Sequence, residues 1–323
     1  MYNKAFKRSH DVYDRTVERK NSRSRNPVVL ARLSELHREF ESDLRQRDEN
    51  NPDWGVFSQF NIEVFSSFAD AKHVWEQFEE DAACFVYQRF AFCRTWYETV
   101  GRKDTTALHI VAVHDLTGAT LMLLPLCIEK TRFATVLKFI GDGMADYLSP
   151  LVQDDFAKNI APDQYNLLWQ NILSTIEEKI DLVWLNRQTN SIVGVKNPVT
   201  MLDGFDFISS SHALNFPPAV NWTRCARTLR SGQTTKKIAR RFSKLATVGK
   251  VEFVEITDRQ QRQQHLDRLL TMKVANLNDA GILHRMDKPE IRQFYSGLVD
   301  DAVLQENLCQ FELLCGGKTI ASA

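Results

Sequence analysis

Asp146 and Tyr147 are adjacent in the sequence and directly follow the short stretch GDGMA. This stretch comes after a predicted strand and contains two glycines, which indicates a flexible, irregular loop at the end of a sheet. A carboxylate in such a loop can orient or deprotonate a hydroxyl or an amine, and a tyrosine can donate a hydrogen bond or stack on a sugar. The structural alternative is that Asp146 caps the loop and Tyr147 packs against the sheet.

A second group of residues with potential chemistry is basic. Between Arg224 and Lys250 there are nine basic residues and no acidic one. The spacing of apolar residues predicts a helix that begins near Thr234 or Thr235 and stops at Gly249. The apolar stripe of this helix, which we expect to dock on the protein, consists of Ile238, Phe242, Leu245 and Ala246.

The cations of this helix lie largely off the apolar stripe. They include Lys237, Arg240, Arg241 and Lys244. Because no carboxylate lies nearby in the sequence, these side chains should create a positive field. The sequence therefore predicts that Lys237, Arg240 and Arg241 bind an anionic ligand, such as the phosphates of a lipid-linked sugar, of CoA or of tRNA. The alternative is a solvated helix face that acidic groups elsewhere balance.

The composition is that of a globular protein with room for two cores. The chain has 323 residues, of which 43% are apolar and 25% are charged, and its formal net charge is zero. This length exceeds the usual size of one domain. No apolar run approaches the roughly 18 to 20 residues that span a bilayer, and the N-terminal stretch lacks the apolar middle of a secretory signal. We therefore expect no transmembrane segment and a cytoplasmic location.

The cysteines do not indicate disulfides or a metal site. No two of them form a C-x-x-C pair and most have apolar neighbours, so we expect buried free thiols and no bound metal. The six cysteines are Cys84, Cys93, Cys127, Cys225, Cys309 and Cys315.

The order of predicted elements occurs twice along the chain, which suggests an internal duplication. Each copy has a strand, two helices and a hairpin of two strands. In the first copy these elements cover residues 60–65, 68–81, 88–101, 108–115 and 119–130. In the second copy they cover residues 250–256, 258–281, 288–301, 309–315 and 318–323. The first copy continues with another strand, a helix at 161–180 and a strand at 181–186.

The second copy stops in its hairpin. Gly316 and Gly317 permit positive φ at both positions, which predicts a two-residue turn of a primed type. By the template of the first copy, the second copy lacks roughly 70 to 75 residues. We therefore expect residues 308 to 323 to form an incomplete sheet with an exposed edge in a C-terminally truncated unit.

Several stretches of the chain, taken with its element order, carry a resemblance to a known family. They are Phe90, Phe92, Trp96 and Tyr97, LLPL at 123–126, FIGDGMADYLSPLV at 139–152, TTKKIARRFSKLATVGKVEF at 234–253 and the terminal hairpin FELLCGGKTIASA. A strand, two helices, an antiparallel hairpin and then strand, helix, strand is the element order of the GNAT acyltransferase fold. Over about residues 60 to 323 the chain resembles the Fem-like tandem GNAT branch and, more narrowly, the CelD-like family associated with cellulose and polysaccharide biosynthesis.

The resemblance implies an α/β fold with a mixed sheet, and an N- or O-acyltransferase that moves an acetyl or acyl group from acyl-CoA to a polysaccharide-related or amine acceptor. In this family acetyl-CoA binds to backbone amides of the strand after the hairpin and to the next loop and helix N-terminus. In the second unit these elements would follow Ala323. The resemblance also implies that His284 and Arg285, in a loop between two helices, border the acceptor site. The alternative is that His284 and Arg285 are simply exposed to solvent. The sequence identifies no catalytic residue.

Two other functions remain open at this point. One is a non-catalytic protein that binds an anionic ligand or nucleic acid, and the other is Fem-like aminoacyl transfer from tRNA. The predicted organisation is a charged N-terminal extension with one amphipathic helix at 1–53, a first GNAT-like unit at 54–205 and a second, truncated unit at 206–323. The sequence does not indicate the oligomeric state.

Overall fold

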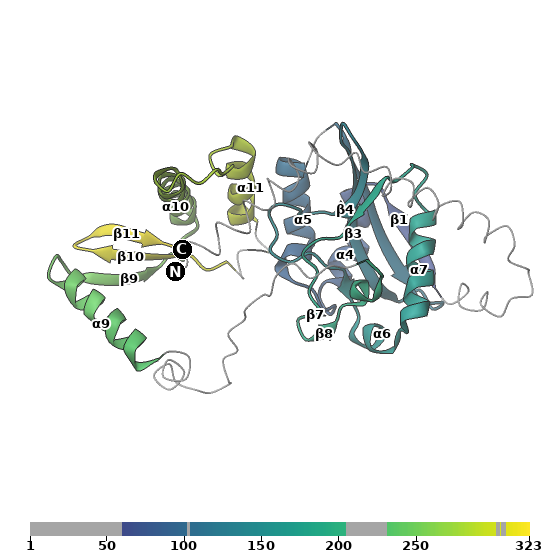
Figure 1. Ribbon diagram of the computed structural model, residues 1–323, viewed down its shortest axis with the longest axis horizontal. Coiled ribbons are helices and arrows are strands. Elements are labelled where there is room, and N and C mark those ends of the chain that lie inside the picture. Colours follow the sequence, from purple (N-terminus) through teal and green to yellow (C-terminus); the bar gives the residue numbers. More distant parts are fainter. Residues whose placement is uncertain (1–59, 102–103, 205–230, 302–303, 305–307) are drawn as a thin grey trace, which may run out of the picture. The chain divides into compact units, whose positions relative to one another are not determined.

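The structure is a computed structural model that describes residues 60–101, 104–204, 231–301, 304 and 308–323 (Figure 1). The predicted N-terminal extension and the predicted boundary at residue 205 lie outside these residues. Among the described residues, Asn61–Asn276 and His284–Ala323 belong to one compact unit, and Leu277–Leu283 belongs to another. The described chain is a mixed α/β fold, as the sequence predicts.

The first part of the chain begins with a strand and helices that pack through aromatic side chains. Ser67 caps the first helix, because its Oγ accepts a hydrogen bond from the backbone N–H of Asp70 at 3.1 Å. Trp75 of this helix is fully buried and its ring lies edge-on to that of Phe90, with 5.6 Å between centroids. The elements are β1 (Asn61–Phe65), α4 (Phe68–Phe78), the 3-10 turn η1 (Val86–Gln88), α5 (Phe90–Trp96) and the π-helical turn η2 (Tyr97–Gly101).

A six-stranded sheet follows, in the order β1-β2-β3-β4-β6, with β5 paired to β3. Its central strands are apolar and buried along most of their length, which is typical of strands that are covered on both faces. The pairs are antiparallel except for β4 and β6, which are parallel. The strands are β2 (Thr106–His114), β3 (Thr120–Lys130), β4 (Thr135–Phe139), β5 (Leu151–Val152) and β6 (Leu182–Trp184).

Short helices and a small hairpin complete this part of the chain. Nε2 of His109 on β2 lies 3.1 Å from the hydroxyl of Thr175, the residue that caps the C-terminus of helix α7. Burial lowers the pKa of this imidazole. The elements are α6 (Asp154–Asn159), α7 (Pro162–Ser174), β7 (Ser191–Ile192), β8 (Val195–Lys196) and the 3-10 turn η3 (Pro198–Met201).

The C-terminal part contains a three-stranded antiparallel sheet in the order β11-β10-β9. Pro289 begins helix α11. A proline is tolerated there because a backbone N–H in the first turn of a helix has no intrahelical acceptor. The elements are α9 (Gly232–Ala246), β9 (Val251–Glu255), α10 (Arg259–Asp279), α11 (Pro289–Asp300), β10 (Phe311–Cys315) and β11 (Lys318–Ser322).

The two sheets begin with the same strand order. In both, the first strand pairs antiparallel with the second, and the second pairs antiparallel with the third. The ends of the first pair also match, since Asn61 faces His114 and Val251 faces Cys315. The hairpins differ in register, because His114 pairs with Thr120 across a longer loop, whereas Cys315 pairs with Lys318 across the two glycines. The element order strand, helix, helix, hairpin therefore occurs twice in the structure.

The turn between β10 and β11 has the predicted geometry. Gly316 has φ 57° and Gly317 has φ 74°, so both adopt the left-handed conformation of a primed turn. Within the described residues β11 is an edge strand, and Ala323 exchanges backbone hydrogen bonds with Phe311 at 2.8 and 2.9 Å. The turn passes close to Gly249, where an added Cβ would lie 2.7 Å from the Cα of Gly316.

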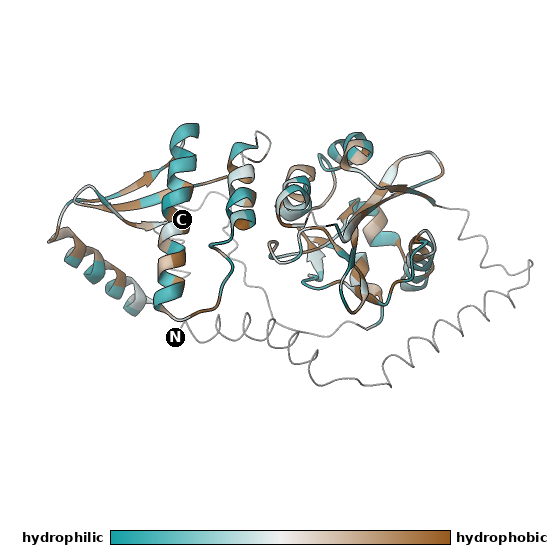
Figure 2. Ribbon diagram, turned by 90° about the horizontal axis from the view of Figure 1, so that it is seen from above, coloured by the Kyte–Doolittle hydropathy of each residue, from teal (hydrophilic) through white to brown (hydrophobic). Residues whose placement is uncertain are grey.

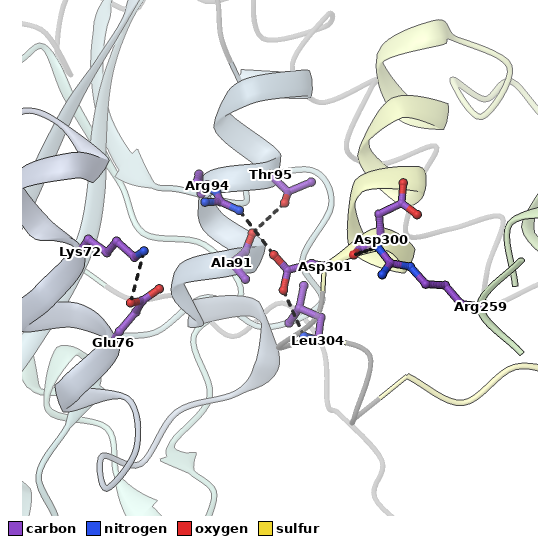
Figure 3. A network of polar contacts seen from close by, with 9 residues as sticks. All are labelled: Lys72, Glu76, Ala91, Arg94, Thr95, Arg259, Asp300, Asp301 and Leu304. Atoms are coloured by element: carbon purple, nitrogen blue, oxygen red, sulfur yellow. Dashed lines mark hydrogen bonds and ion pairs between the residues drawn. The ribbon is translucent and has the colours of Figure 1, made fainter. Parts of the chain in front are cut away.

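Helices α5 and α11 pack closely against each other. Phe92 and Phe294 meet edge to face with 5.2 Å between ring centroids. A Cβ added at Gly297 would lie 2.7 Å from Cγ2 of Thr95, so glycine permits this approach. The Oγ1 of Thr95 donates to the carbonyl of Ala91 at 2.8 Å (Figure 3). The helix pair is therefore packed with no space for an additional methyl group at this point.

Charged groups surround the same helix pair. Arg94 and Asp301 lie 3.5 Å apart, and Asp301 also accepts a hydrogen bond from the backbone N–H of Leu304 at 3.2 Å (Figure 3). At the start of α5, the buried carboxylate of Glu79 accepts a hydrogen bond from the N–H of Phe90 at 2.7 Å. Burial raises the pKa of Glu79 although this hydrogen bond opposes the shift.

The described cysteines are free thiols, in line with the sequence prediction. Cys93, Cys127 and Cys315 are buried as predicted, Cys84 is partly buried, and Cys309 is exposed, contrary to the prediction. Burial raises the pKa of Cys84 to about 11 and that of Cys127 to about 12. These two thiols are therefore held in the protonated form at neutral pH.

Candidate functional site

The loop that carries Asp146 and Tyr147 is fixed by the turn before it. Gly141 and Gly143 have φ of 98° and 85°, which only glycine adopts readily. Between them, Asp142 accepts a hydrogen bond from Nδ2 of Asn186 at 3.1 Å and lies 3.5 Å from Nζ of Lys138. The expectation of a flexible GDG stretch is therefore wrong, because the Asp142 carboxylate ties this turn to β4 and to the segment after β6.

Lys138 and Asp142 form part of a buried ionic group. Nζ of Lys138 also lies 2.6 Å from Glu129 on β3. Desolvation lowers the pKa of Lys138, but the two carboxylates outweigh this effect and the pKa is raised overall. The carbonyl of Asp142 in addition accepts a hydrogen bond from the indole of Trp96 at 3.2 Å, which links the turn to α5.

Gln88 holds the next part of the loop from the opposite side. Its side chain is buried, its Nε2 donates to the carbonyl of Tyr147 at 2.8 Å, and its Oε1 accepts from the hydroxyl of Ser149 at 3.1 Å. The same Oε1 accepts from the N–H of Phe85 at 3.3 Å. A single amide side chain thus fixes the Asp146 loop to the segment just before α5.

Asp146 is exposed, and its carboxylate accepts a hydrogen bond from the hydroxyl of Tyr87 at 3.0 Å. Burial raises the pKa of Tyr87 to about 12, and the negative charge of Asp146 adds to the shift. Burial also raises the pKa of Tyr295 on α11, again with a contribution from Asp146. The carboxylate therefore lies near two tyrosines that remain protonated at neutral pH and can act as hydrogen-bond donors.

Aromatic rings surround this carboxylate. Tyr147 lies on Phe85 with 4.9 Å between ring centroids and near Tyr87 at 6.2 Å. Tyr87 in turn meets Phe92 of α5 edge to face at 5.4 Å. We call Phe85, Tyr87, Tyr147 and Tyr295, together with Asp146, the Asp146 site. An exposed carboxylate among tyrosines can bind a hydroxyl or an ammonium group through hydrogen bonds, charge and ring faces.

The sequence identified two members of the Asp146 site and missed the others. Tyr87 is 59 residues from Asp146 in the sequence, and Tyr295 belongs to the helix of the second copy. No periodicity relates such distant positions. The one sequence signal close to this region was the aromatic helix with Phe90, Phe92, Trp96 and Tyr97, which begins shortly after Tyr87.

His284 and Arg285 lie in the loop between α10 and α11 and have local partners. Nδ1 of His284 accepts a hydrogen bond from the N–H of Met286 at 3.1 Å, and the side chain is only 9% exposed. Arg285 is 61% exposed and lies 3.6 Å from Glu290 in the first turn of α11. The structure thus gives His284 a role in the loop itself and leaves Arg285 at the surface.

Helix α9 differs from the prediction at its start and in its packing. Ser231 is the N-cap, since its Oγ accepts from the N–H of Thr234 at 3.2 Å, so the helix begins at Gly232 and not near Thr234. The expected docking of the apolar stripe is only partial, because Ile238 and Leu245 are half-buried whereas Phe242 is 47% exposed. Lys237, Arg240 and Arg241 are exposed, as predicted.

The first sheet does not fit acetyl-CoA. The residues Val136, Leu137 and Lys138 of β4 pair with β3 on one side and with β6 on the other, so their backbone is not open to a pantetheine arm. The turn after β4 directs the N–H groups of Met144 and Ala145 to the carbonyl of Gly141. Two carboxylates lie in this loop, and they would repel a pyrophosphate. For the second sheet, the resemblance places the cofactor strand after β11.

The fold and the Asp146 site define a mixed α/β protein with a carboxylate set among aromatic side chains. No protein-family model matches the chain, and no curated protein matches it. Within the described ranges, no three His, Cys, Asp or Glu side chains are grouped so that they could hold a metal ion. A helix long and apolar enough to cross a membrane is likewise not found among the residues that the structure describes.

Proposed function

We propose that the chain is a GNAT-like N- or O-acyltransferase that binds its acceptor at the Asp146 site. The observation that carries this proposal is the repeated start of the two sheets, with one strand order. The first copy continues with β4, the short strand β5, the helices α6 and α7 and the parallel strand β6, and a strand, helix, strand order is expected for a GNAT unit. The shared start of the two sheets supports the resemblance to the Fem-like and CelD-like branch.

In this proposal Asp146 orients the nucleophilic hydroxyl or amine of the acceptor and accepts its proton. The exposed carboxylate and the rings of Tyr87 and Tyr147 support this role, since a sugar or an amine can stack on the rings while it donates to the carboxylate. Acetyl-CoA is the expected acyl donor. Its site belongs to the second unit by resemblance, and the first sheet does not supply it. The free thiols of the described cysteines support a cytoplasmic location as part of the same proposal.

The test measures thermal unfolding of the purified chain with glucosamine, which has one amine and several hydroxyls, as the acceptor probe. Glucosamine at about 100 times its dissociation constant should stabilise the native state by about 2.7 kcal/mol and raise the thermal midpoint. Asp146→Asn should remove most of this protection, because the neutral amide no longer attracts the ammonium group. Asp163→Asn, at an exposed position of α7, is the matched control and should keep the protection. Release of free CoA thiol from acetyl-CoA in the presence of glucosamine would show the transfer directly.

Absence of thermal protection by glucosamine would contradict acceptor binding at the Asp146 site and with it the acyltransferase proposal. The second candidate, a non-catalytic protein that binds an anionic ligand, would then be favoured, because exposed cations cover α9. Transfer of an aminoacyl group from aminoacylated tRNA to the acceptor would instead identify the third candidate. Equal loss of protection in Asp146→Asn and Asp163→Asn would remove Asp146 from the proposed site.

A further inference from the structure

Helix α9 carries three parallel rows of side chains at positions i, i+4 and i+7. The middle row is apolar and consists of Ile238, Phe242 and Leu245. Each of these residues is preceded by a cation, which gives a basic row of Lys237, Arg241 and Lys244. Each is followed by a small residue, which gives a third row of Ala239, Ser243 and Ala246. An apolar row with cations along one side and small residues along the other is compatible with a helix that lies in a membrane interface.

The apolar row is partly accessible to solvent. No residue of α9 is buried, Phe242 is 47% exposed, and Ile238 and Leu245 are half-buried. Two further apolar side chains close to this helix in the sequence are even more open, with Val248 at 80% and Phe253 at 69%. Phe253 stacks on Phe311 of the neighbouring strand at 5.0 Å, so this exposed ring is held in place. Ordered, exposed apolar groups of this kind mark an interaction surface.

The cations of α9 are not neutralised by the described part of the chain. None of the described carboxylates forms an ion pair with Lys236, Lys237, Arg240, Arg241 or Lys244. The next basic residue after the helix, Lys250, pairs with Glu252 at 2.7 Å. Hydrophilic and hydrophobic residues alternate along the ribbon of the helix (Figure 2). Its unpaired cations create a positive field beside the apolar row.

We propose that α9 binds the surface of an anionic phospholipid bilayer and lies parallel to it. The helix of 15 residues is about 22 Å long, so one face can contact the headgroup layer over its whole length. Ile238, Phe242 and Leu245 insert between acyl chains, while the flanking lysines and arginines extend to the phosphates. A nucleic acid would use the cations but would leave the apolar row in water, which is why the bilayer is the better partner.

This proposal does not depend on the acyltransferase proposal, since it uses no residue of the Asp146 site. The test measures sedimentation of the full chain with vesicles of phosphatidylcholine that contain roughly one third phosphatidylserine. The chain should bind these vesicles and should bind pure phosphatidylcholine vesicles far more weakly. Raising the salt well above the ionic strength at which the Debye length is about 8 Å should release it.

Two variants test the cations and the apolar row of α9 separately. Lys237→Glu with Arg241→Glu, both in the basic row, should lower the partition coefficient by at least about 30-fold, because two attractive cations are lost. Phe242→Ser should lower it by roughly tenfold while the salt dependence stays, because only apolar insertion is lost. Both variants should keep the thermal midpoint, since none of the three positions is buried.

The matched controls carry the same changes at exposed positions elsewhere. They are Lys179→Glu with Lys196→Glu for charge, and Phe133→Ser for the exposed ring. Equal losses in controls and α9 variants would overturn the proposal, because binding would then follow net charge alone. Equal binding to both kinds of vesicle would also overturn it. Tighter binding to single-stranded RNA than to anionic vesicles, with Phe242→Ser unchanged, would assign the helix to nucleic acid instead.

Discussion

Replacing Gly297 by alanine tests the close packing of α5 on α11. In an exposed helix interior this change stabilises by about 1 kcal/mol, because glycine has more backbone freedom to lose. Here the new Cβ would lie 2.7 Å from Cγ2 of Thr95, about 1 Å inside normal contact. Thr95 cannot rotate away cheaply, since its Oγ1 donates to Ala91 at 2.8 Å and its Cβ is branched.

The size of the effect follows from these opposing contributions. Overpacking of one methyl group costs about 2 kcal/mol in a tight contact, which exceeds the gain in helix propensity. Gly297→Ala should therefore destabilise the protein by about 1 kcal/mol. In a Thr95→Ser background the clashing methyl group is absent and the hydroxyl is kept. There the same change should stabilise by up to about 1 kcal/mol, so its sign reverses.

Urea unfolding of the four proteins in this double-mutant cycle measures the coupling between the two positions. We expect a coupling of about 2 kcal/mol, seen as a shift of the unfolding midpoint without a change of slope. The same destabilisation by Gly297→Ala in both backgrounds would refute the contact between Thr95 and Gly297. Stabilisation in the wild-type background would show that α11 moves away from α5 at little cost.

Two further substitutions test other contacts. Gly249→Ala should destabilise by about 2 kcal/mol, because its Cβ would meet backbone atoms of Gly316 at 2.7 and 2.8 Å, whereas Gly232→Ala has open space and should not destabilise in thermal unfolding. Burial raises the folded-state pKa of Glu79, so native stability should fall as pH rises from its ordinary value of 4.5 through the raised pKa. Glu79→Gln should remove this fall in stability, whereas the control Glu80→Gln should keep it. Urea unfolding midpoints measured across this pH range test the prediction. The same pH dependence in both variants would contradict it.

Much of the fold could be predicted because local signals agreed with it. The glycine pair 316–317 specified the turn geometry, and the short runs of residues on either side of it specified the two strands. The start of α9 was misplaced because Ser231, Thr234 and Thr235 are all good N-caps, and the pattern of apolar residues does not distinguish among them. Local signals thus fix the type of an element better than its boundary.

The Asp146 site could be predicted only in part. The residue pair at 146–147 stood out because it follows two glycines after a strand, which is a local signal. The hydroxyl of Tyr87 that binds Asp146, and the amide of Gln88 that holds the loop, come from a segment about 60 residues earlier, at separations of 59 and 61 residues. Such contacts depend on how the helices pack on the sheet, which spacing within one segment does not encode.

The π-helical turn Tyr97–Gly101 has a consequence for how this chain can vary. A π turn accommodates one residue more than an α turn between hydrogen-bonded groups. Here the extra width brings Gly101 beneath the ring of Trp96, where an added Cβ would lie 2.1 Å from the ring. Deleting one residue from this turn would let α5 continue as a regular helix while Trp96 keeps its hydrogen bond to Asp142. We therefore expect homologous sequences to differ by a single-residue gap at this turn, and those with the gap to be released from the requirement for glycine.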